Sequence, residues 1–226
     1  MLRIAHRGAK GYAAENSIGA FRKALELHSD GIEIDVHLNA SGEVMVIHDE
    51  TVDRTTNASG KVKELTSDDF RKIRIKNTVE NVPTLTETID FLAASCLLNV
   101  EIKSADATDG VIREIDLAVE EKGWSFDQFL ISSFDWLVLK KIKETRPEIP
   151  IGVLTETDLP LAIEFAKVYG VHSIHPHFHL IDELSVSQMQ SIGLKVFAWT
   201  ANDPSDIKQL KDFGVDAIIS DFPDRI

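Results

Sequence analysis

Short runs rich in isoleucine, valine and leucine alternate with helical stretches along nearly the whole chain. Such apolar runs are typical of strands covered on both faces, and their alternation with helices indicates a parallel sheet. We expect strands over residues 2–6, 31–38, 97–103, 129–132, 150–154, 171–175, 195–199 and 216–220. We expect helices over residues 17–28, 85–95, 109–122, 135–145, 158–169, 182–192 and 203–213. Eight such strands favour an α/β fold of the (β/α)8 TIM-barrel type over a doubly wound sheet, with a truncated last helix after Ser220.

One stretch interrupts the repeat between the second strand and the second helix. We expect residues 49–83 to form a small insertion, or cap, on a single barrel domain that spans residues 1–226, with a short helix over 67–74. A long loop inside a compact domain is usually functional, and the loops that follow barrel strands lie on the catalytic face. The insertion is therefore expected to border the functional site.

Charge and composition disfavour several classes of partner. The net charge of −13 disfavours nucleic acid and anionic membranes as main partners. No apolar run approaches the roughly 20 residues that span a bilayer, and the N-terminus lacks the order of a signal peptide. The one cysteine, Cys96, fits a reducing compartment. We expect a cytoplasmic protein with no nucleic-acid partner and no stable membrane association, as a monomer or a homodimer.

Acidic side chains recur inside two of the expected strands. Residues two apart in a strand share a face, so Glu33 and Asp35 point to one side, and Glu101 repeats the pattern in the next strand. Carboxylates in an apolar strand are unfavourable unless a cation balances them, and oxygen ligands suit Mg²⁺ or Ca²⁺. We interpret these three residues as ligands of a divalent metal. The alternative is that Glu33 and Glu101 form structural ion pairs with Arg7 and Lys103.

Two histidines and two cations fall near the ends of the same strands. Imidazole exchanges protons near neutral pH, so His6 and His48 are candidates for the acid and base of a phosphate transesterification. Arg7 and Lys103 supply positive charge for the phosphate. The order of the two histidines in the reaction does not follow from the sequence.

Aromatic and histidine side chains follow several of the later strands. Phe134 and Trp199 come after the fourth and seventh strands, and we expect them to form a wall for the ligand on the catalytic face. His175, His177 and His179 alternate at the exit of the sixth strand and offer a weaker alternative, a site for a softer metal.

The residues named above belong to a series of short motifs that run in order along the chain. The motifs are His6-Arg7-Gly8, Ala14-Glu15-Asn16-Ser17, Glu33 to Val36, His48-Asp49, Asp53-Arg54-Thr55-Thr56, Pro83-Thr84-Leu85, Glu101-Ile102-Lys103, Ser133-Phe134, Trp199-Thr200 with Asn202, and Ser220-Asp221-Phe222-Pro223. Together they resemble the glycerophosphodiester phosphodiesterase family from the N-terminus to the last strand. Ala14 and Ser17 depart from the proline and threonine of the family pattern, and Ser17 still suits a helix N-cap.

The resemblance implies a TIM-type barrel that hydrolyses small-molecule glycerophosphodiesters to sn-glycerol 3-phosphate and a free alcohol. It implies that the glycerol 2-hydroxyl of the substrate attacks the phosphorus, and that water then opens a cyclic phosphate. The family roles carry over as metal ligands Glu33, Asp35 and Glu101, acid–base residues His6 and His48, and phosphate-binding residues Arg7 and Lys103.

Three other functions fit parts of the sequence. A lipid-directed barrel phosphodiesterase of the phospholipase D type would need an apolar membrane-facing surface, which the polar insertion does not offer. An inactive binding barrel would have lost a metal ligand or a histidine, and none of the matched positions is lost. A Schiff-base aldolase would need a desolvated lysine, whereas Lys103 has Glu101 on the same face of its strand.

Overall fold

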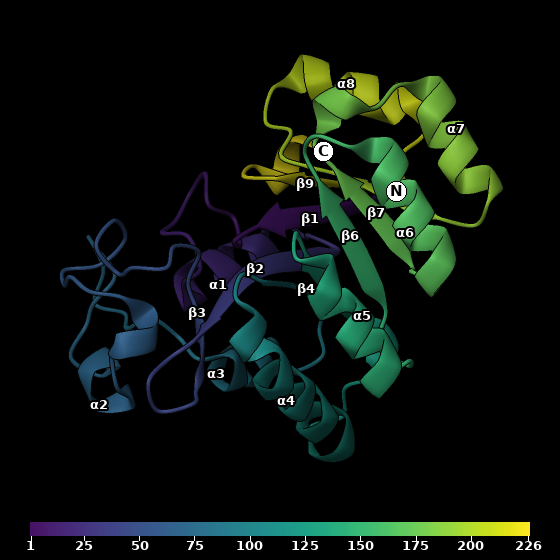
Figure 1. Cartoon of the computed structure of the whole chain (residues 1–226). Helices are drawn as coiled ribbons and strands as arrows, with labels where there is room; N and C mark the ends of the chain where they lie inside the picture. The colour runs from purple at the N-terminus through teal and green to yellow at the C-terminus, as the bar shows by residue number, and fades with distance from the viewer.

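Eight parallel strands close into a barrel in the computed structural model, which describes all residues 1–226 (Figure 1). The strands are β1 (Leu2–His6), β2 (Gly31–Leu38), β4 (Leu97–Ile102), β5 (Phe129–Ser133), β6 (Ile151–Thr155), β7 (Ser173–Pro176), β8 (Lys195–Ala198) and β9 (Ala217–Ser220). Neighbouring strands follow chain order around the barrel, and β1 closes it by pairing with both β2 and β9. The predicted TIM-type fold is confirmed.

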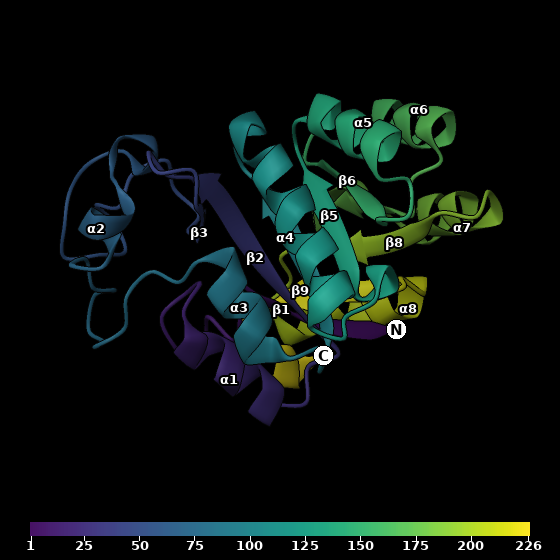
Figure 2. The same cartoon turned by 90° about the horizontal axis from the view of Figure 1, so that it is seen from below.

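Seven helices surround the barrel, one in each of the predicted regions (Figure 2). They are α1 (Ile18–Glu26), α3 (Leu85–Leu92), α4 (Thr108–Glu121), α5 (Trp136–Thr145), α6 (Leu159–Tyr169), α7 (Glu183–Ser191) and α8 (Pro204–Phe213). Local sequence explains several helix starts: Ser17 caps α1, and Thr84 forms a capping box with Glu87 at α3. After β9 the chain forms a 3₁₀ turn, Pro223–Arg225.

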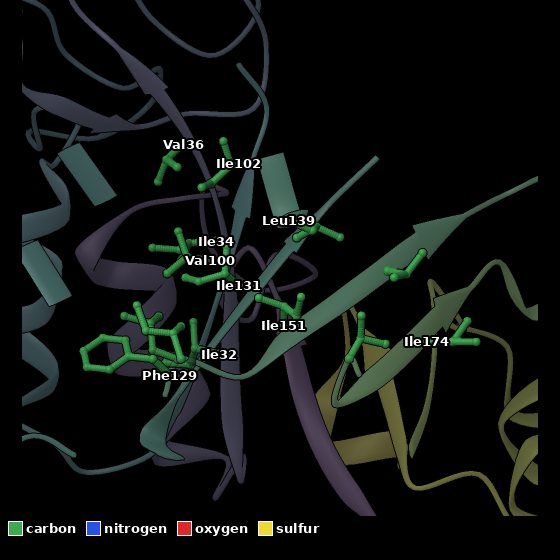
Figure 3. Close-up of a cluster of buried hydrophobic side chains, with 14 of the residues drawn as sticks. Ile32, Ile34, Val36, Val100, Ile102, Phe129, Ile131, Leu139, Ile151 and Ile174 are labelled. Atoms are coloured by element: carbon green, nitrogen blue, oxygen red, sulfur yellow. The ribbon is translucent and has the colours of Figure 1, made fainter. Parts of the chain in front are cut away.

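The main core lies between the outer face of the barrel and the helices. Ile32, Ile34 and Val36 on β2, with Val100 and Ile102 on β4, belong to this layer (Figure 3). The side chains between them point into the barrel instead, because successive strand residues face opposite sides. Part of the interior is filled by a small apolar cluster, which comprises Ile4, Leu130, Phe197, Ala217 and Ile219.

The insertion after β2 packs a small core of its own and lies to one side of the barrel (Figures 1 and 2). In the structure this insertion begins before residue 49, with β3 (Val44–Val46), which pairs antiparallel with β2. That strand was not predicted, because three residues are too few to show a hydrophobic period. The helix expected over 67–74 is a single turn, α2 (Ser67–Phe70). The insertion core comprises Met45, Ile47, Val52, Val62, Phe70, Ile73, Ile75 and Val82.

None of the helices combines the length and the apolar character that crossing a membrane requires.

Candidate active site

Three carboxylates meet inside the carboxyl end of the barrel. Asp35 on β2 lies level with Glu101 on β4, and Glu33 stands one interior position earlier on β2. An oxygen from each lies within 4.8 Å of the others. Burial raises the pKa of Glu33 well above its usual range and raises that of Glu101 to about 7, and the neighbouring carboxylates add to both effects. A divalent cation would relieve this repulsion, and the all-oxygen donor set fits a hard cation.

Arg7 and Lys103 border the carboxylates. The backbone N–H of Arg7 donates to Glu33 Oε2 at 2.9 Å, and its Nε lies 3.1 Å from Asp35 Oδ2. Lys103 Nζ donates to Glu101 Oε1 at 2.6 Å and lies 3.8 Å from Asp35 Oδ1. Of the two ion pairs considered as the alternative, the Glu101–Lys103 pair forms and the Glu33–Arg7 pair does not, because the Arg7 guanidinium pairs with Asp35 and Glu15. Glu33 receives only the Arg7 backbone N–H, and its Oε1 is buried without a hydrogen-bond partner.

His6 is held by a carboxylate from the other end of the chain. Its Nδ1 lies 2.6 Å from Asp221 Oδ1, just after β9. Asn202 fixes Asp221 in turn, because its Nδ2 donates to Asp221 Oδ2 at 3.0 Å and its Oδ1 accepts the Asp221 N–H at 2.8 Å. Burial lowers the pKa of His6, although the hydrogen bond to Asp221 acts in the opposite direction.

His48 lies on the insertion and pairs with the next residue. Its Nδ1 is 2.7 Å from Asp49 Oδ1, and Arg54 Nε donates to Asp49 Oδ2 at 2.7 Å. Arg54 also donates to Glu15, which accepts from Arg7 at 2.8 Å as well. Burial alone would raise the pKa of Glu15, but the hydrogen bonds from Arg54 and Arg7 lower it to about 2. A chain of charged groups thus ties the insertion to the barrel.

Most of the predicted site residues share one cavity at the carboxyl end of the barrel. Those that line it are His6, Arg7, Glu33, His48, Glu101, Lys103, Phe134 and Trp199. Asp35 lies beside it, buried against Arg7 and Asn16. The rings of Phe134 and Trp199 meet edge to face with centroids 5.6 Å apart. His48 Nε2 lies 3.3 Å from Lys103 Nζ, so the insertion and the barrel meet in this cavity.

Sequence reasoning assigned no role to several groups that hold the site together. Asn16 donates to Asp35 Oδ2 at 2.9 Å, while Asp221 and Asp49 orient the two histidines. Asn99 and Ser132 also line the cavity, each with a buried side-chain oxygen that has no partner. Asn16, Asp49 and Asp221 lie within the sequence motifs described above, which gave them no role of their own. For Asn99 the available signal was its place two residues before Glu101, on the same face of β4.

The alternating histidines do not gather into a metal site. His175 points into the barrel, where its ring stacks on Phe197 at 5.0 Å and its Nε2 meets Ser173 Oγ at 2.9 Å. The chain has one group of side chains that could hold a metal, and it is the carboxylate cluster of Glu33, Asp35 and Glu101. The alternative of a softer metal site is therefore not supported.

A TIM barrel with an acidic cluster, two histidine–carboxylate pairs and two cations at its carboxyl end has the residue types that phosphodiester cleavage needs. Residues 6–225 match the model of the glycerophosphoryl diester phosphodiesterase family, and the chain belongs to that family.

Individual relatives match over nearly their whole length. A glycerophosphodiester phosphodiesterase of Caldanaerobacter subterraneus is 37% identical over 234 residues, covering 100% of this chain and 96% of the relative. Among solved structures, an Oleispira antarctica phosphodiesterase in complex with the product sn-glycerol-3-phosphate superposes with a TM-score of 0.90 at 29% identity, covering 99% of this chain and 94% of that one. A glycerophosphodiester phosphodiesterase of Thermotoga maritima gives 0.83 at 25% identity, covering 99% and 96%.

Proposed function

We propose that this chain hydrolyses glycerophosphodiesters to sn-glycerol 3-phosphate and an alcohol in a metal-dependent reaction. One observation carries the proposal: a single cavity holds two histidines, an acidic cluster and two cations, all at the carboxyl end of the barrel. Family membership supports the reaction, and the Oleispira antarctica neighbour binds the product that this reaction would release.

Glu33, Asp35 and Glu101 would hold the divalent cation, Mg²⁺ or Ca²⁺. The fit rests on their shared oxygen chemistry, on the unpartnered Glu33 Oε1, and on the raised pKa values that mark a lack of balancing charge. When bound, such a cation lowers the pKa of a substrate hydroxyl and stabilises negative charge on the phosphoryl oxygens.

His6 and His48 would move the protons. Each has its Nδ1 on a carboxylate, which orients the ring and balances the charge of its protonated form. The reaction needs one ring neutral, with Nε2 as an acceptor, and the other protonated, with Nε2–H as a donor. One imidazole takes the proton of the glycerol 2-hydroxyl as that oxygen attacks phosphorus, and the other gives a proton to the departing alcohol. Water then opens the cyclic phosphate with the two roles reversed, which returns both histidines to their starting states.

Arg7 and Lys103 would hold the phosphate, and the two rings would form the wall beside it. Arg7 has a left-handed backbone (φ 53°) and is followed by Gly8 at φ 76°, where a Cβ would come within 2.7 Å of Ala20. This tight turn keeps the Arg7 side chain over the carboxylates. Lys103 Nζ lies 5.9 Å from the centre of the Phe134 ring, so the phosphate-binding and aromatic parts of the cavity adjoin.

Release of glycerol 3-phosphate tests the proposal directly. Glycerophosphocholine, glycerophosphoethanolamine and glycerophosphoglycerol would be supplied in turn, with product measured by coupled glycerol-3-phosphate dehydrogenase. We expect EDTA to abolish release and Mg²⁺ or Ca²⁺ to restore it. Glu33→Gln should lose activity while still folded, whereas Glu121→Gln, an exposed carboxylate at the far end of α4, should not. Absence of release from every ester with either metal would refute the proposed function.

A further inference from the structure

A row of aromatic rings leads out of the cavity along the ends of three strands. Phe134 follows β5, Trp199 follows β8, and His177 and Phe178 follow β7; these four residues are called the aromatic arc. Trp199 meets Phe134 at 5.6 Å and His177 at 5.2 Å between ring centroids, both edge to face. His177 then stacks on Phe178 at 5.0 Å. The arc is therefore continuous from the cavity wall outwards.

Backbone hydrogen bonds fix the arc in place beyond the named ends of the strands. The N–H of Phe178 donates to the carbonyl of Trp199 at 2.9 Å, and the N–H of His177 donates to the carbonyl of Thr155 at 2.8 Å. The Trp199 indole N–H donates to the carbonyl of His175 at 2.7 Å. A surface held this rigidly loses little conformational freedom when a ligand binds, so its shape is available for recognition.

The charge beside His177, at the other end of the arc from Lys103, is negative. Glu156 follows β6 directly beside His177, because Thr155 and Pro176 are register partners. It is exposed and forms no ion pair or hydrogen bond. Burial lowers the pKa of His177, which favours the neutral ring at neutral pH, although Glu156 acts in the opposite direction. Lys103, at the inner end, is the one cation that lies against a ring of the arc.

We propose that the aromatic arc and Glu156 bind the positively charged nitrogen of the departing alcohol, so that the enzyme prefers glycerophosphodiesters of choline-type amino alcohols. Ring faces attract cations, best when the site is partly dry, and a free carboxylate adds to the attraction. The arc begins at Phe134 and Trp199 in the cavity wall. Of the two groups on the phosphate only the departing alcohol can carry a positive charge, so a cation site at the arc fits that group and not the glycerol. The inference rests on the proposed function, because it concerns the alcohol end of the same substrate.

Two esters of the same shape, one with a charged alcohol and one with a neutral alcohol, provide the test. In glycerophosphocholine the alcohol carries a trimethylammonium group, and in glycerophospho-3,3-dimethylbutanol an uncharged tert-butyl group of the same shape replaces it. We expect kcat/KM for the choline ester to be on the order of tenfold higher, as a partly buried cation–π contact predicts. Equal values would overturn the inference and leave the proposed function standing. Hydrolysis of neither ester would overturn both.

Three variants locate the source of the preference. Glu156→Gln and Phe134→Leu should each lower the ratio of the two kcat/KM values by about threefold, since each removes one part of the cation site. Glu121→Gln removes the same charge at the far end of α4 and should leave the ratio unchanged. An equal fall with Glu121→Gln and Glu156→Gln would assign the preference to the net charge of −13 and would overturn the local site. A ratio unaffected by all three variants would also overturn it.

Discussion

The two histidine–carboxylate pairs look alike at the cavity but are built in different ways. His6 and Asp221 come from opposite ends of the chain and meet because β1 and β9 are neighbours in the closed barrel. His48 and Asp49 are adjacent in sequence and lie on the insertion. The side chains of the barrel pair are 14% and 17% exposed, against 31% and 27% for the insertion pair. Closure of the barrel thus brings His6 and Asp221 together, whereas a local loop positions His48 and Asp49.

The groups that hold the two carboxylates, Asn202 and Arg54, differ just as clearly. Asn202 holds Asp221 by two hydrogen bonds and also accepts from Ser220, so it has no freedom to turn. Arg54 donates two hydrogen bonds to Asp49 and two to Glu15, but its side chain is 49% exposed, so water can take the place of Asp49 as its acceptor. Similar chemistry at the cavity therefore rests on a buried, rigid support at His6 and on an exposed, adaptable support at His48.

The largest effects should come from the histidines themselves. We expect His6→Asn and His48→Asn each to lower kcat by about 10³-fold, within the range of general acid–base catalysis. The double variant should lose less than the product of the two single losses, because two groups that act in one proton-transfer sequence are not additive.

Steady-state kinetics with glycerophosphocholine would measure these losses, with circular dichroism to show that each variant remains folded. A loss below tenfold for either histidine would remove it from the acid–base pair. In that case the two pairs would no longer be comparable.

Replacing the carboxylate partner of each histidine should affect the rigid pair more than the adaptable pair. In Asp221→Asn the fixed Asn202 donor claims the remaining oxygen, which leaves an NH₂ group facing His6 Nδ1 and forces the wrong tautomer. In Asp49→Asn the oxygen can stay on His48, while Arg54 keeps its hydrogen bonds to Glu15 and donates to water in place of the second Asp49 oxygen. We therefore expect kcat to fall about 100-fold for Asp221→Asn and about tenfold for Asp49→Asn.

The kcat ratio of these two variants is the measurement, and replacement of Asn202 supplies the control. Asp221→Asn combined with Asn202→Asp should recover part of the loss, because the new carboxylate accepts from the amide and frees its oxygen to turn. Equal losses for the two single variants would contradict the idea that the supports differ.

The sequence was sufficient to predict the barrel and those site residues that lie two positions apart in one strand. Periodic apolar runs predicted all eight barrel strands, and spacing of two placed Glu33 and Asp35 on one face. The short β3 strand was missed because its three residues become a strand only by pairing with β2, and the local sequence does not show that pairing. The role of Asp221 was missed because it depends on contact between residues 215 positions apart.

His175, which has no carboxylate partner, is a second residue whose surroundings the local sequence could not predict. Its spacing with His177 and His179 raised the possibility of a metal site, but strand alternation and barrel closure turn it onto Phe197 instead. Gly152 makes room for it, since a Cβ there would lie 2.4 Å from the His175 Nε2. Nothing in the local sequence distinguishes a packed interior histidine from a ligand.

His175 should therefore respond to pH in a way that sharpens the contrast with the paired histidines. Burial lowers its pKa to about 3, so the folded protein keeps it neutral while the unfolded chain protonates near pH 6.5. Its contribution to stability is complete above pH 6.5 and is lost as the pH falls towards 3. At pH 5 the loss is about 2 kcal/mol in the free energy of unfolding.

Urea unfolding at pH 7 and pH 5 would measure this effect in the wild type and in His175→Gln. Glutamine is neutral at both values, so the drop between them should be smaller by about 2 kcal/mol in the variant, whatever its absolute stability. The same drop in both proteins would show that His175 is protonated inside the barrel.

The smallest expected effect concerns the chain of charges that ties the insertion to the barrel. Arg54→Gln removes the link between Asp49 and Glu15, and partly exposed ion pairs of this kind contribute about 1 kcal/mol or less. Hydrogen exchange should show faster opening at the amides of Val52 and Thr56, while those of the barrel strands keep their protection. Arg71→Gln is the matched control, because Arg71 pairs only with the exposed Asp68 three residues away in the same insertion. Exchange that accelerates equally in the barrel strands would mean that the two supports open as one unit, and the contrast between a rigid and an adaptable half of the site would not hold.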